Sequence, residues 1–111
     1  MNTRIEYLNI ADCNIDGEQT EILCKSLKLN KELQLLFLRN CKIGDTGAEA
    51  IAKLIQNNNN LKELEIFKCH IGDKGGKAIE DSLKSNFCIE KLSIGDNDFG
   101  VESNKEMIEQ I

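Results

Sequence analysis

The five cysteines are the residues of this sequence best suited to hold a metal or to act as nucleophiles. Three of them recur 28 residues apart, and they are Cys13, Cys41 and Cys69. Zinc motifs bring their ligands together at short, motif-specific spacings, which this column does not have. We therefore predict a small polar side chain that hydrogen-bonds the loop backbone, with Asn97 in the same role one repeat later. Neither Cys24 nor Cys88 has a neighbouring base, which argues against a nucleophilic thiol.

The remaining titratable residues also lack the arrangement that catalysis requires. His70 is the only histidine, and it belongs to a polar column that also contains Asn14, Lys42 and Asp98. A catalytic histidine needs an orienting partner and a pocket, and the sequence indicates neither. Asp45 and Asp73 recur in a turn before a helical segment, where helix capping and the helix dipole explain a carboxylate. We expect no catalytic residue, no bound metal and no cofactor.

The composition indicates a soluble folded protein without nucleic-acid or membrane partners. The chain has 111 residues, of which 41% are hydrophobic and 30% charged, with 14 basic and 19 acidic residues and a net charge of −5. An acidic balance disfavours binding to phosphate backbones and to anionic lipid surfaces. No apolar run approaches the roughly 20 residues that cross a bilayer. The odd number of cysteines and the absence of a signal-like start favour a reducing, cytoplasmic location.

An unbroken period of 28 residues organises the chain. Five columns of apolar or small residues repeat without an insertion, and the first of them contains Ile5, Leu33, Leu61 and Ile89. This regularity predicts a single domain over residues 1–111 with four repeats. Their approximate bounds are 5–32, 33–60, 61–88 and 89–111.

Each repeat predicts a strand, a turn, a helix and a loop. Apolar residues first alternate with period two, as in a strand with one buried face, and then recur at helical spacing. Gly47 and Gly75 lie in the turn, where a tight backbone suits glycine. An asparagine column follows each helix, and it contains Asn30, Asn58 and Asn86. Because asparagine tolerates the left-handed conformation that ends helices, we interpret this column as the C-terminal stop.

The spacing L-x-x-L-x-L-x-x-C/N-x-I-x-x-x-G resembles that of ribonuclease-inhibitor-like leucine-rich repeats, from Ile5 to Ile111. The resemblance implies an α/β solenoid of four strand–turn–helix repeats, with a parallel sheet on the concave face and helices on the convex face. It also implies a protein–protein interaction module. The outer repeats depart from the pattern: Gln19 and Ser103 replace the turn glycine, and Glu106 replaces a helix alanine. Terminal repeats are often atypical because they cap the stack.

The outward strand positions gather an unusual share of the aromatic residues. We predict that a partner protein binds there, through Tyr7, Leu35, Phe37, Arg39, Glu65 and Phe67. Aromatic residues and arginine are the types that most often anchor interfaces. The alternation with core leucines prevents these side chains from turning inward. We expect Phe37 and Phe67 to be the anchors.

Two other functions remain open from the sequence. One branch of this repeat class regulates GTPases as activators, although no functional residue of that branch can be matched here. The chain could equally be a structural unit that stacks on itself or on a longer parent protein. Because the terminal strand edges lack an obvious cap, we also expect self-association through the ends of the solenoid.

Overall fold

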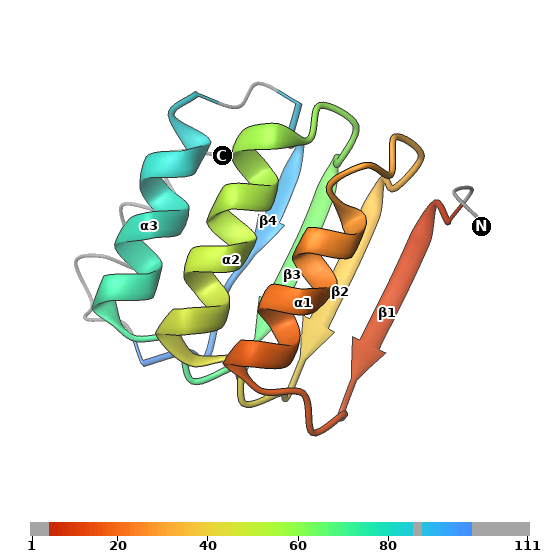
Figure 1. Ribbon diagram of the computed structural model, residues 1–111. Coiled ribbons are helices and arrows are strands. Elements are labelled where there is room, and N and C mark those ends of the chain that lie inside the picture. The colour runs from red at the N-terminus through yellow and green to blue at the C-terminus, as the bar shows by residue number, and fades with distance from the viewer. Residues whose placement is uncertain (1–4, 86–87, 99–111) are drawn as a thin grey trace.

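The computed structural model describes residues 5–85 and 88–98, in which strands and helices alternate along the chain (Figure 1). The strands are β1 (Tyr7–Ala11), β2 (Leu35–Arg39), β3 (Glu63–Phe67) and β4 (Lys91–Ser93). The helices are α1 (Gly17–Leu27), α2 (Gly44–Asn57) and α3 (Asp73–Leu83). The helix expected in the fourth repeat, with Ser103 and Glu106, lies outside the described residues.

The strands form one parallel sheet in the order β1-β2-β3-β4, and its register follows the sequence period. Residues 28 positions apart face each other across neighbouring strands. One such row consists of Leu8, Leu36, Leu64 and Leu92. The period therefore fixes both the pairing of the strands and their alignment.

All three helices cover the same face of the sheet, side by side and nearly aligned (Figure 1). The core lies between the two layers, where Leu36, Leu38, Leu64 and Ile66 are at most 1% exposed. This arrangement confirms the expected α/β solenoid. Among the helices of the described residues, none is long and apolar enough to cross a bilayer.

Helix α1 begins with its own capping box, which explains why repeat one departs from the glycine pattern. Asp16 accepts a hydrogen bond from the backbone N–H of Gln19 (2.9 Å), and the Gln19 side chain accepts one from the N–H of Asp16 (3.0 Å). These bonds satisfy two backbone donors that a helix leaves free at its start. Gln19 thus serves a purpose that glycine cannot.

Helix α3 is capped from the neighbouring repeat rather than from its own N-cap residue, Gly72. The carboxylate of Asp45, in the first turn of α2, accepts hydrogen bonds from the N–H groups of Gly72 (2.8 Å) and Gly75 (2.9 Å). We had expected the turn aspartates to cap near their own helix start. The structure instead uses Asp45 to join two adjacent helices.

Replacing Asp45 with alanine should lower the free energy of unfolding by about 1–2 kcal/mol, the usual cost of a lost helix cap. Chemical denaturation of both proteins measures the difference. The matched control is Glu49→Ala on the same helix, which removes only an exposed pair with Lys74 (3.6 Å). That change should cost less, because surface ion pairs contribute about 0–1 kcal/mol. Equal costs would contradict a capping role for Asp45.

The asparagine column works differently from the prediction. Asn58 does end α2, but it is extended (φ −116°, ψ 119°) rather than left-handed. Its side-chain oxygen accepts hydrogen bonds from the N–H groups of Asn60 (2.7 Å) and Leu61 (2.9 Å). Asn30 bonds the corresponding N–H groups of its own loop, and both asparagines are buried. The left-handed interpretation was therefore wrong for these two, because the amide stabilises the entry to the next strand. Asn86 lies outside the described residues.

Candidate functional site

The sheet face opposite the helices, which we call the open face, bears all six residues predicted to contact a partner. In strands β1 to β3 the core residues alternate with side chains that point away from the helix layer. Tyr7 and Arg39 are exposed, whereas the other four are half-buried. The register brings the six into adjacent strands: Tyr7 in β1, Leu35, Phe37 and Arg39 in β2, and Glu65 and Phe67 in β3.

Two aromatic residues of the open face pack against each other. The rings of Tyr7 and Phe37 have centroids 5.2 Å apart and an interplanar angle of 79°, an edge-to-face contact. The pair is diagonal, because Phe37 lies directly opposite Asn9 in the register. Edge-to-face pairs contribute about 0.5–1.5 kcal/mol beyond their buried area. The contact therefore holds Phe37 in a defined position on the open face.

A second cluster surrounds Phe67. The Arg39 guanidinium lies 5.5 Å from the centroid of the Phe67 ring, and Arg39 also forms an ion pair with Glu65. The ring packs close to the backbone of β4's neighbour Gly95, where an added Cβ would approach the Phe67 ring to 2.8 Å. The cation–π contact predicted from the strand rows is confirmed. Phe67 is thus fixed between a cation and a glycine backbone, with part of its surface free.

A hollow of about 360 Å³ lies at the ends of the strands, beside the second cluster. Arg39 and Phe67 line it together with four residues of the following turns, namely Asp12, Asn40, Lys68 and Asp96. These four share a left-handed backbone, with φ between 53° and 57°. We did not predict the hollow from the sequence. The available signal was the polar column itself, since Asn and Asp tolerate this conformation better than most residues.

A sequence model of a family described as leucine-rich repeat matches residues 30–52 and 57–79. The two segments are successive copies of the repeat, and they contain β2 and β3 with the helices that follow. This chain is a leucine-rich-repeat protein. Its 28-residue units, each with a strand and a helix where described, have the form expected of the ribonuclease-inhibitor-like class.

Two solved structures illustrate the likeness of this leucine-rich-repeat chain to known folds. One is described as leiomodin-1 actin-binding site 2; its TM-score is 0.82 and its identity 24%, and the match covers 95% of this chain but 62% of that one. The other is a tropomodulin C-terminal domain from Caenorhabditis elegans, with a TM-score of 0.60, 15% identity and coverage of 98% and 83%. No curated protein sequence matches significantly. At these identities the likeness concerns the fold.

The cysteine column of the leucine-rich repeats binds backbone carbonyls, as predicted. The thiol of Cys41 donates to the carbonyl of Ile10 (3.4 Å), and that of Cys69 donates to the carbonyl of Leu38 (3.3 Å). Asn97 continues the pattern in repeat four with several amide hydrogen bonds to the loop backbone. Each thiol therefore links its repeat to the preceding one. Across residues 5–85 and 88–98, no group of three or more His, Cys, Asp or Glu could hold a metal ion.

Burial also makes the interior thiols poor nucleophiles. It raises the pKa of Cys24 to about 12 and that of Cys69 to about 11, and it raises the pKa of Cys41 as well. A raised pKa leaves the thiol protonated at neutral pH, and the thiolate is the reactive form. His70 is exposed, and its only described charged neighbour is the similarly exposed Asp98 at 3.9 Å. Neither group forms a catalytic arrangement within the described part of the chain.

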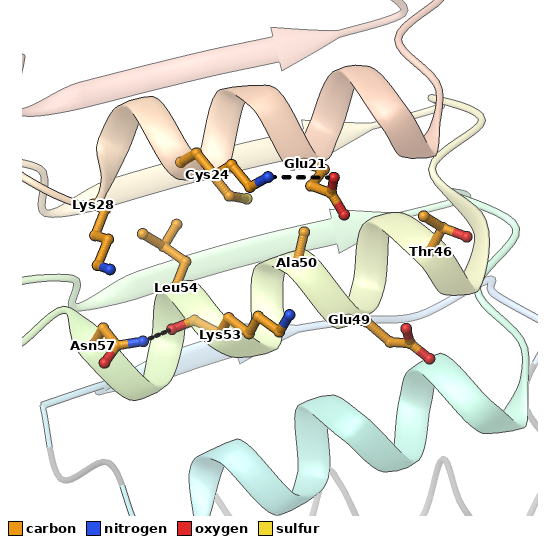
Figure 2. Close-up of a pocket in the computed structure, with 10 residues that line it drawn as sticks. Glu21, Cys24, Lys28, Thr46, Glu49, Ala50, Lys53, Leu54 and Asn57 are labelled. Carbon is orange, nitrogen blue, oxygen red and sulfur yellow. Dashed lines mark hydrogen bonds and ion pairs between the residues drawn. The ribbon is translucent and has the colours of Figure 1, made fainter.

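A second hollow, of about 270 Å³, lies between α1 and α2 on the helix side of the leucine-rich repeats (Figure 2). Cys24, Ala50 and Leu54 give it an apolar floor, because small side chains separate the two helices here. Charged residues of both helices surround it, including Lys28 and Lys53 (Figure 2). The sequence analysis assigned no role to this side of the protein.

Proposed function

We propose that this chain is a protein-binding module whose partner docks on the open face. Its contacts would be Tyr7, Leu35, Phe37, Arg39, Glu65 and Phe67, without a catalytic residue or cofactor. The observation that carries the proposal is the pair of ordered aromatic clusters on a sheet face that no described helix covers. We also propose that residues 1–111 form a single domain and that the protein acts inside the cell.

Fixed but partly exposed aromatic rings suit an interface for two reasons. Their apolar surface is available for burial, and their position is already ordered, so a partner loses less conformational entropy on binding. The Tyr7–Phe37 contact orders the first cluster, and Arg39 with Gly95 orders the second. Arg39 and Glu65 would add directional polar contacts beside the rings.

Actin is the first partner to test. The description of the leiomodin-1 structure names an actin-binding site, and this fold likeness is the reason to begin with actin. The chain spans only 62% of that structure, so binding by the whole of leiomodin-1 need not transfer. An unrelated protein that presents apolar and charged side chains to the open face would fit the same proposal.

Replacing both Phe37 and Phe67 with alanine should weaken partner binding at least a hundredfold, because buried aromatic anchors often contribute about 2 kcal/mol each. The measurement is affinity for purified actin, accompanied by quantitative capture from a cell lysate. The melting temperature should change little, since both rings lie outside the core.

The matched control is Lys53→Ala, an exposed residue on the helix side. It should bind the partner like the original chain. Undiminished capture by the double variant, combined with loss in the control, would move the site to the helix side. Absence of actin binding alone would exclude actin as the partner and leave the open face to be tested with the captured protein.

A further inference from the structure

Large exposed apolar side chains are concentrated at one end of the molecule. In the part of the chain that the structure describes, they are Ile5 (37% exposed), Tyr7 (53%), Ile22 (65%) and Leu29 (82%). All four belong to the first repeat, on β1, α1 and the segments beside them. We call this surface the outer face of repeat one. Contiguous exposed apolar surface of this kind often marks a protein interface.

The core behind the outer face is incompletely covered. Leu8 and Ile10 of β1 are only partly buried, whereas their equivalents Leu36 and Leu38 in β2 are 0% exposed. The difference arises because repeat one covers repeat two, and no described repeat covers repeat one. Strand β1 is also the edge of the described sheet (Figure 1). An edge strand presents unpaired backbone donors and acceptors to a partner strand.

We propose that the outer face of repeat one binds the same face of a second copy of this chain about a twofold axis. Strand β1 would pair antiparallel with β1 of the second copy, and α1 would pack antiparallel against α1. The two sheets would join across the axis, and the four exposed apolar side chains of each copy would be covered. This interface uses the end of the solenoid, so it is separate from the proposed function of the open face, although Tyr7 borders both.

The charge distribution along α1 favours a second copy in this orientation. The helix carries Glu18 and Glu21 in its first half, and basic residues gather toward and after its end, at Lys25, Lys28 and Lys31. An antiparallel contact sets the acidic half of one copy near the basic half of the other. A parallel contact would set like charges side by side. A surface that complements itself in this way is typical of twofold interfaces.

Tyrosine fluorescence offers a direct readout of the contact, because the sequence contains one Tyr, Tyr7, and no Trp. With rising protein concentration, the mass from light scattering should approach that of two chains. Over the same range, acrylamide quenching of Tyr7 should decrease as the ring becomes covered. A chain that stays monomeric at the highest concentration, or a Tyr7 whose quenching is unchanged in the dimer, overturns the proposal.

The double variant Ile22→Glu with Leu29→Glu should raise the dimer dissociation constant at least tenfold. Both side chains are largely exposed in the single chain, so its circular dichroism should be unchanged. The matched control, Lys53→Glu, introduces a carboxylate on the exposed surface of α2 and should dimerise as before. Equal dimerisation of variant and control refutes the interface. Masses that grow beyond two chains would indicate open-ended stacking and would refute the twofold arrangement.

Discussion

Replacing Leu64 with alanine is expected to lower the free energy of unfolding by about 2–5 kcal/mol, as truncation of a buried leucine usually does. Leu64 is 1% exposed and lies in the register row between Leu36 and Leu92. Repeats on both sides cover it, so the surrounding structure has little freedom to fill the cavity. The same cost is expected for Leu36, which is 0% exposed. Urea denaturation followed by circular dichroism measures both.

Ile5→Ala is the comparison that ties this cost to position in the stack. Ile5 is 37% exposed, and its truncation should cost clearly less than either leucine change. In a solenoid, stability depends on the interfaces between neighbouring repeats, and repeat one has only one described neighbour. Equal costs at Ile5 and Leu64 would mean that repeat one is covered as well as repeat three. That result would contradict the burial pattern.

Replacing Gly75 with valine should destabilise the protein by about 3 kcal/mol, the upper part of the range for overpacking a core. Even a Cβ at this position would lie 2.7 Å from the Cβ of Ala48, 2.7 Å from Oδ1 of Asp45 and 2.9 Å from Cγ2 of Ile71. The added carbons would force α3 away from α2. They would also displace the carboxylate that caps α3, so packing and capping fail together.

Lys74→Val separates this clash from the general effect of valine in a helix. Lys74 is the preceding residue of the same helix turn, and its side chain is 77% exposed. Because valine is a slightly better helix former than glycine, propensity alone would make Gly75→Val mildly stabilising. A large loss for Gly75→Val with a small change for Lys74→Val supports the packing argument. Similar small changes for both would contradict it.

The features that the sequence predicts well are those that its period imposes on every repeat. Alternation of apolar residues indicated the strands, and the constant spacing of the leucine columns indicated how Leu36 and Leu64 align. The same alternation predicted which face Phe37 and Phe67 would occupy. These predictions succeed because a slip of one residue would expose the whole core, which leaves a single acceptable register.

Other features depend on which of several nearby partners a side chain contacts, and a period carries no such information. Phe37 has neighbours on both sides in the sheet, and the structure pairs its ring with Tyr7. Asp45 could have capped its own helix, yet its carboxylate reaches the next one. Asn58 has two backbone conformations open to it, and the extended one lets its amide bond the following loop. Such choices follow from distances of a few ångströms that only the folded chain defines.

The cap that Asp45 supplies has a consequence for how such a chain can be rearranged by duplication or deletion. The position 28 residues before Asp45 is Gly17, which has no carboxylate to offer, and α2 accordingly begins without a side-chain cap. If repeat two were deleted, repeat three would follow repeat one and lose the acceptor for Gly72 and Gly75. Each repeat thus contains part of the start signal for its successor, and the order of the repeats is itself inherited information.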